Sequence, residues 1–176
     1  MVTINYISKT DKYKSDIKNL LIKYDDEFIP SLSSRHSTIQ TKDLDISKNN
    51  SIKSYLKDII NQELIIAKYN DKLIGFLSFR QIEQYNTLKE YSPCIYVSTT
   101  IVEKSYRKNH IAKDMNKYMF KNIIPNRNIT YITRRTWSTN IASINYIESM
   151  GFKIVKKVKD DRGKNIHTLY YAKEIK

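Results

Sequence analysis

Hydrophobic and polar residues follow two different periods along the chain, and each period predicts one type of secondary structure. Apolar residues three or four positions apart indicate a helix with one buried face, whereas alternation or a short apolar run indicates a strand. The helical period covers four segments: 11–24, 51–62, 110–122 and 138–150. Strand patterns cover seven segments: 2–7, 63–69, 72–82, 94–102, 128–137, 152–158 and 167–175. The predicted order, β-α-α-β-β-β-α-β-α-β-β, is typical of a mixed sheet covered by helices.

Polar residues and glycine mark the ends of several of these segments. Ser51 is placed to cap the second helix, and Ser138 or Thr139 to start the fourth. Gly151 follows the fourth helix at the position where a left-handed residue commonly ends a helix. The residues "NDK" at 70–72 fit a short hairpin turn between two strands.

The remaining segment and the composition bound the architecture. Residues 25–50 are polar around "IPSLSSR" and are predicted to be a long loop with a broken helix. A chain of 176 residues favours one domain over 1–176, large enough to fold without disulfides or metals. Cys94 is the single cysteine, which excludes an intrachain disulfide framework and favours a reducing compartment. We see no signal peptide and no apolar run near ~20 residues, so we expect a cytoplasmic protein without a membrane span.

The chain is strongly basic, with a formal charge of +13 and a pI near 9.6. Such a charge attracts polyanions. Lysine is spread along the whole sequence rather than gathered in one segment, so the charge is weak evidence for nucleic acid. The three histidines lack metal-ligand spacing and there is no Cys/His cluster, so we expect no metal.

The stretch "SYRKNHIAKDM" (105–115) is the clearest candidate for ligand chemistry. It is cationic and lies between a predicted strand and a predicted helix. A turn of this kind presents backbone N–H groups to an anion at a helix start, although an ordinary basic connection is the alternative. Such turns usually carry glycine, and this one has none. Asparagine and histidine tolerate positive φ relatively well, so Asn109 and His110 favour a cradle that survives without glycine. If His110 is already helical in φ instead, its ring could donate to a phosphate.

Two segments resemble the GNAT family of N-acyltransferases, which use acetyl-CoA. "VEKSYRKNHIA" is similar to the family's pyrophosphate-binding turn, Arg/Gln-x-x-Gly-x-Gly/Ala, with His110 at the usual glycine position. "TNIASINYIESMGF" is similar to the family's Asn-x-x-Ala/Ser helix that ends in Gly-Phe. Gly75 also lies where members often have a glycine in the third strand. The resemblance in sequence covers roughly 72–158, and the order of elements extends it over the chain.

The resemblance implies an α/β (α+β) fold with a mixed, mostly antiparallel sheet of about seven strands. Helices would cover both faces, and the fourth and fifth strands would splay to admit the pantetheine arm. The activity implied is transfer of an acetyl group from acetyl-CoA to an amine by direct attack in a ternary complex. The cofactor-binding residues implied are Ile101, Val102, Arg107, Lys108, Asn109, His110, Ile111, Ala112, Asn140 and Ser143.

The catalytic groups depart from the family pattern. The family's usual acid is a tyrosine four residues before the helix-ending glycine, and here that position is Ile147. Tyr146 is one residue earlier and is the candidate substitute; packing and unaided departure of the thiolate are the alternatives. The candidate bases are Glu83, Glu103 and the acidic residues at 25–27.

The acceptor is open at this stage. Glu27, with the other acidic residues at 25–27, would recognise a cationic amine or belong to a solvated loop. Arg35 and His36 could instead bind an acidic group. Trp137 would line the acceptor cleft or belong to the core. The partners expected are acetyl-CoA and an amine acceptor, small molecule or peptide, bound by a monomer or homodimer. The alternative function is a non-catalytic module of the same fold that binds CoA, another anion or RNA, with aromatic residues such as those in "RRTW" stacking on bases.

Overall fold

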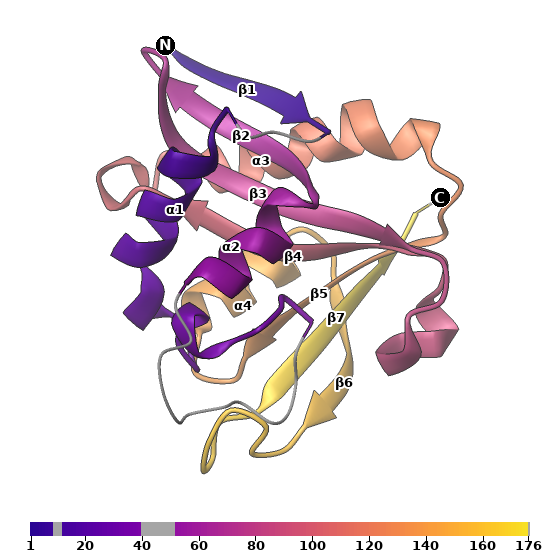
Figure 1. Ribbon diagram of the computed structural model, residues 1–176. Coiled ribbons are helices and arrows are strands. Elements are labelled where there is room, and N and C mark those ends of the chain that lie inside the picture. Colours follow the sequence, from indigo (N-terminus) through magenta and orange to yellow (C-terminus); the bar gives the residue numbers. More distant parts are fainter. Residues whose placement is uncertain (9–11, 40–51, 176) are drawn as a thin grey trace. The chain divides into compact units, whose positions relative to one another are not determined.

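The computed structural model describes residues 1–8, 12–39 and 52–175 (Figure 1). The chain divides into two compact units. Unit 1 contains Met1–Phe79 and Ser98–Arg127, and unit 2 contains Arg80–Val97 and Asn128–Lys176. The fourth strand passes from unit 2 into unit 1, so it contributes residues to both.

The order of helices and strands agrees with the sequence prediction. The strands are β1 (Val2–Ile7), β2 (Glu63–Tyr69), β3 (Lys72–Ile82), β4 (Cys94–Val102), β5 (Tyr131–Trp137), β6 (Lys153–Val158) and β7 (Thr168–Glu174). The helices are α1 (Lys14–Lys23), α2 (Lys53–Ile60), α3 (Ile111–Tyr118) and α4 (Ile141–Ser149). The seven strands pair in the order β1-β2-β3-β4-β5-β7-β6. The predicted mixed α+β class with a mostly antiparallel sheet is confirmed.

Unit 1 places helices on both faces of β1, β2 and β3. Leu64 and Ile66 of β2 belong to a buried cluster with residues of α1 and α2, among them Leu21 and Ile59. Successive strand residues point to opposite faces, and the buried Ile65 lies between these two. Helix α3 contacts β1 and β2 and passes on the other side of these strands from α1 and α2 (Figure 1).

Unit 2 is built on antiparallel pairs of β5 with β7 and of β7 with β6. The first part of β4 pairs with β5 in parallel, from Cys94↔Tyr131 to Val97↔Arg134. Tyr170 of β7 packs with a 3-10 segment, η3 (Asn86–Tyr91), which the sequence pattern did not predict. The next residue, Tyr171, donates to Glu148 of α4 at 3.2 Å, so α4 lies against the opposite face.

Several predicted boundaries needed correction. The cap of α4 is Asn140, whose side chain accepts the Ser143 N–H at 3.1 Å. The prediction of Ser138 or Thr139 is wrong, because Ser138 instead accepts the His167 N–H at 3.0 Å. The predicted helix 110–122 becomes α3 followed by a π-helical turn, Met119–Ile123. Ser51 lies outside the described residues.

Other local predictions are confirmed. Asn70 and Asp71 both have positive φ, 47° and 63°, as a tight hairpin turn requires. Gly151 follows α4 with φ 81°. The loop after α1 contains two 3-10 turns, η1 (Asp25–Glu27) and η2 (Leu32–Ser34), while its predicted residues 40–50 lie outside the described residues. The splay between β4 and β5 concerns both units and stays a prediction.

Gly75 lets β3 and β4 approach closely within unit 1. A Cβ added at Gly75 would lie 2.8 Å from the Ile101 carbonyl oxygen and 3.3 Å from the Val102 Cα. These are backbone atoms, so β4 itself would have to move. We expect Gly75→Ala to lower the free energy of unfolding by about 1–3 kcal/mol, as overpacking of this kind does.

Urea denaturation of Gly75→Ala beside Lys72→Ala would measure this loss. Lys72 is exposed on the same strand, so its replacement controls for the change in strand composition. An unchanged denaturation midpoint in Gly75→Ala would show that β4 adjusts without cost.

Candidate functional site

The basic turn of unit 1 contains two left-handed residues directly before a helix, Lys108 and His110. A short 3-10 segment, η4 (Lys104–Tyr106), follows β4, and α3 begins at Ile111. His110 is the N-cap residue of α3 and is left-handed, with φ 60° and ψ 7°. Of the two conformations left open for His110 by the sequence, the structure has the left-handed one rather than the helical one. The second positive φ of the turn falls on Lys108, at 65°, and not on Asn109.

The side chain of Asn109 serves the turn in another way. Its amide nitrogen donates to the carbonyl oxygens of both Tyr106 and Arg107, each at 3.4 Å, so this side chain links Asn109 to the two residues. Lys108, Asn109 and His110 are exposed, and the imidazole of His110 caps no amide of α3. The first-turn N–H groups of a helix need partners from outside the helix. Together with the helix dipole, they form a positive site that solvent anions can reach.

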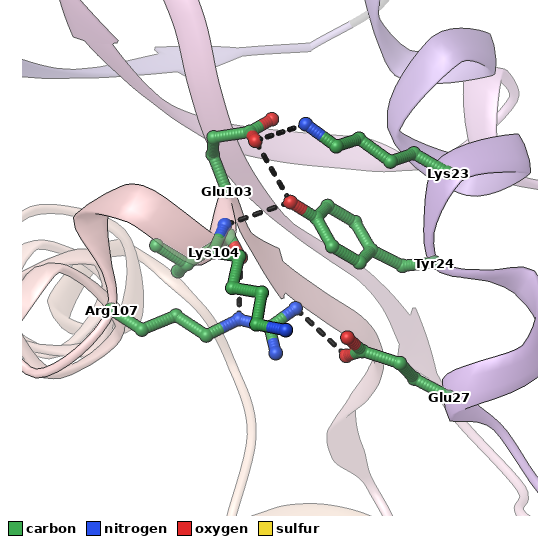
Figure 2. Close-up of polar contacts among 7 residues, drawn as sticks. Lys23, Tyr24, Glu27, Glu103, Lys104 and Arg107 are labelled. Atoms are coloured by element: carbon green, nitrogen blue, oxygen red, sulfur yellow. Dashed lines mark hydrogen bonds and ion pairs between the residues drawn. The ribbon is translucent and has the colours of Figure 1, made fainter.

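Three residues fix the start of this turn to the end of α1 (Figure 2). The Tyr24 hydroxyl oxygen accepts the Lys104 N–H at 2.7 Å and donates to the Glu103 carboxylate at 2.9 Å. The Lys23 ammonium forms an ion pair with the same carboxylate. The Glu103 N–H also donates to the Ile74 carbonyl of β3 at 2.7 Å. The turn is therefore held from both α1 and β3.

Arg107 lies inside this arrangement (Figure 2). Its Nε donates to the Val102 carbonyl at 2.9 Å, and its Nη2 lies 2.8 Å from the Glu27 carboxylate. The guanidinium carbon stands 4.7 Å from the centre of the Tyr24 ring, a cation–π distance. The structure thus brings together Arg107, predicted for the cofactor, and Glu27, predicted for the acceptor. A direct contact of either with a ligand stays a prediction.

The other residues predicted for the cofactor occupy element ends. Ile101 and Val102 are buried at the end of β4, where Val102 accepts from Arg107. Ile111 is buried at the start of α3, and Ala112 follows it half-buried. In unit 2, Asn140 and Ser143 form the N-terminal cap of α4. The sequence motif therefore corresponds to a helix cap, as its Asn-x-x-Ser spacing allows.

Tyr146 lies half-buried on α4 and interacts with Arg134 of β5. Arg134 is buried, and its guanidinium stands 4.8 Å from the centre of the Phe152 ring. Burial lowers the pKa of Arg134, while the Tyr146 hydroxyl acts in the opposite direction. Ile147, at the position of the family's acid, is buried. Tyr146 thus interacts with β5 through Arg134, and its catalytic role stays a prediction.

The residues predicted for the acceptor already have intramolecular roles. Arg35 is 6% exposed and donates to the Pro30 carbonyl from Nε at 3.1 Å and from Nη2 at 2.6 Å. It therefore closes the loop after α1 on itself. Trp137, at the end of β5, is half-buried under the guanidinium of Arg162, at 5.5 Å. Arg35 and Trp137 therefore already have intramolecular partners.

A polar cluster in unit 2 has no counterpart among the predicted residues. Arg135 of β5 donates to the Tyr170 hydroxyl at 3.4 Å, and the Tyr85 and Tyr96 rings lie 5.3 Å apart beside it. Burial lowers the pKa of Arg135, but the hydroxyls of Tyr96 and Tyr170 outweigh burial and raise it. The cluster joins residues from four different segments, which no local motif reveals.

Neither a cluster of metal-ligating side chains nor a membrane-spanning helix is present among the described residues. In the part of the chain that the structure describes, no group of three His, Cys, Asp or Glu side chains is placed to hold a metal ion. Over the same residues, none of the helices combines the length and apolar character that crossing a bilayer needs.

The Glu103 interactions predict a pH dependence. The Lys23 ammonium and, after it, the Tyr24 hydroxyl lower the pKa of the Glu103 carboxyl. Because this carboxyl has a lower pKa in the folded protein than in the unfolded chain, its ionised form stabilises the folded state. The stabilisation is fully present above the pKa of the unfolded chain, ~4.3, and is lost as pH falls through the pKa of the folded protein. We expect Glu103→Gln to lower the urea midpoint at pH 7 and to approach the wild type in acid. The exposed Glu90→Gln is the control, and a deficit independent of pH would contradict this account.

Comparison with known proteins agrees with this fold. The sequence family described as the acetyltransferase (GNAT) domain matches residues 14–169. No curated protein matches significantly. A GNAT-family protein from Desulfovibrio desulfuricans has a TM-score of 0.71 at 7% identity, with 99% of each chain covered. Arabidopsis thaliana NAA60, bound to a bisubstrate analogue, has a TM-score of 0.69 at 16% identity, with 98% of each chain covered.

A third solved structure is an aminoglycoside 6'-N-acetyltransferase complexed with coenzyme A. Its TM-score is 0.67 at 18% identity, and 98% of this chain and 96% of that chain are covered. At these identities the structures show a shared fold, whereas the family match extends over most of the sequence. The chain belongs to the GNAT family of acetyltransferases.

Proposed function

We propose that this protein transfers an acetyl group from acetyl-CoA to an amine of a small molecule or peptide. The observation that carries the proposal is the glycine-free turn at 107–112, which keeps a left-handed residue at the N-cap of α3. The GNAT-family match supports the same activity. So do two similar folds, one crystallised with coenzyme A and one with a bisubstrate analogue.

In this proposal the cofactor is held mainly by backbone groups. The N–H groups of residues 108–112 would bind the pyrophosphate, and Lys108 adds positive charge in solvent. The backbone of Ile101 and Val102 would bind the pantetheine amides as a neighbouring strand does. Asn140 and Ser143, at the start of α4, would lie along the cofactor in unit 2.

The reaction is attack by the neutral amine on the thioester carbonyl. A C–N bond forms, the C–S bond breaks, and the amine loses a proton to a base while the thiolate leaves. A backbone N–H of β4 would stabilise the developing oxyanion. Glu103 is a poor base because its pKa is lowered by Lys23 and Tyr24. Tyr146 is the proposed proton donor to the thiolate.

A second candidate function is CoA or anion binding without turnover. The observation that favours it is Ile147, an apolar and buried residue where relatives have their acid. The charge of +13 would support anion binding in either case. Release of free thiol distinguishes the two functions, because only the enzyme consumes acetyl-CoA.

Acetyl-CoA is expected to stabilise the folded protein. Binding to the native state alone adds RT ln(1 + [L]/Kd), which is about 2.7 kcal/mol at 100 times Kd. Denaturant unfolding with and without acetyl-CoA measures this gain, with a single-stranded oligonucleotide as the comparison ligand. No stabilisation at millimolar acetyl-CoA would count against the proposal, and stabilisation by the oligonucleotide alone would favour the RNA-binding alternative.

Tyr146→Phe tests the proposed proton donor. We expect a lower kcat with unchanged affinity for acetyl-CoA, since general acids contribute typically 10²–10⁴-fold. The assay is free thiol release over a panel of amines, amino acids and peptides, followed by kinetics on the best acceptor. An unchanged kcat would assign Tyr146 to packing against Arg134 and leave protonation of the thiolate to water.

A further inference from the structure

The turn before α3 carries backbone strain that something else must offset. Lys108 and His110 both have positive φ, at 65° and 60°. For a residue with a Cβ, the left-handed conformation is less stable than the right-handed one, because the Cβ lies too close to the following carbonyl oxygen. Conformations of this kind persist only where the surrounding structure over-determines them. In a relative with glycine at position 110, this part of the strain would be absent.

Tyr24 contacts three of the residues that lead into this strained turn: Glu103, Lys104 and Arg107 (Figure 2). The first amide of η4, that of Lys104, receives no cap from the side chain of Glu103. Instead the Tyr24 hydroxyl, 80 residues away in sequence, accepts that N–H at 2.7 Å. The same hydroxyl donates to Glu103, whose carboxylate is fixed by Lys23. Glu103 therefore orients the Tyr24 hydroxyl, and the hydroxyl holds the N–H of Lys104.

The ring of Tyr24 fixes the second part of the turn. Arg107 stacks on it at 4.7 Å while its Nε holds the Val102 carbonyl. Arg107 and Val102 are the two ends of the chain reversal after β4, so this hydrogen bond closes the reversal. The ion pair with Glu27 is partly exposed and contributes little by itself. Tyr24 is 3% exposed, so its own position is set by the core of unit 1.

We propose that Tyr24 is a positioning residue for the acetyl-CoA site. Tyr24 holds residues 103–107 in place, so that the backbone N–H groups of the strained turn, at 108–112, keep the geometry that binds the cofactor. Arg107 has the same role from within the turn. The inference rests on the proposed function, because it concerns the affinity of that site for acetyl-CoA. It adds a determinant on α1, far in sequence from the motif of the turn.

Tyr24→Phe is the direct test, because it removes the hydroxyl and keeps the ring. A hydrogen bond network of this type is worth about tenfold in an equilibrium constant or more. We expect the Kd for acetyl-CoA, measured by calorimetric titration, to rise about tenfold, with kcat at saturation within about twofold of the wild type. Tyr13→Phe is the matched control, since Tyr13 precedes the same helix and packs against the same core. It is expected to leave Kd unchanged.

A rescue experiment separates positioning from simple loss of stability. Adding His110→Gly to Tyr24→Phe removes part of the strain that the hydroxyl offsets. We expect the double variant to bind acetyl-CoA within about threefold of the wild type, a non-additive effect for two residues in one network. Loss of stability alone would lower the melting temperature without this recovery.

The outcomes are distinct. Wild-type protein that fails to bind acetyl-CoA overturns the proposed function and this inference with it. Binding to the wild type with an unchanged Kd in Tyr24→Phe overturns the inference alone. If Tyr24→Phe does not fold, Glu103→Gln serves as the second variant, because it removes the charge that orients the hydroxyl. A smaller rise in Kd supports the inference, and an unchanged Kd in that variant overturns it.

Discussion

A single phenol hydroxyl joins the first helix to the segment that carries the family motif. Tyr24 accepts the N–H of Lys104 and donates to Glu103, which are 80 and 79 residues away in sequence. Together with the bond from Glu103 to Ile74 of β3, this pair of bonds fixes the start of a segment that contains two non-glycine residues with positive φ. A chain without glycine at this place needs such external support. The strained residues belong to the turn, whereas Tyr24, which offsets the strain, is the C-cap residue of α1.

The two requirements that glycine meets in an anion-binding turn explain how this turn tolerates histidine. Glycine is favoured in anion cradles because it allows positive φ and close approach of the ligand. His110 adopts the positive φ, at 60°, with an energetic cost, and its side chain is exposed to solvent. The helix start and its N–H groups do not depend on the side chain at this position. The motif can therefore lose its glycine and keep the backbone arrangement that the glycine served.

The sequence predicted the local features well and the long-range ones poorly. Among the residues that the structure describes, periodicity identified every strand and the four α-helices, and residue type indicated that His110 could be left-handed. The cap of α4 was misplaced because Ser138 has a partner, His167, that is 29 residues away. The Tyr24 contacts and the Arg135 cluster were missed for the same reason. Each depends on the register of segments distant in sequence, and single-residue patterns carry no register.

The departures from the family pattern have a common physical logic. His110 replaces a glycine and Ile147 replaces a tyrosine, yet both neighbouring elements keep their ends: α3 starts at a left-handed residue and α4 keeps its Asn140 cap. In the proposed reaction the phosphates, the pantetheine amides and the oxyanion are all bound by main-chain groups. Backbone N–H groups are fixed by the fold, so substitutions that preserve the fold preserve them. Protonation of the leaving thiolate is the one step assigned to a side chain, and it is the step that Ile147, in place of the family's usual tyrosine, puts on another group.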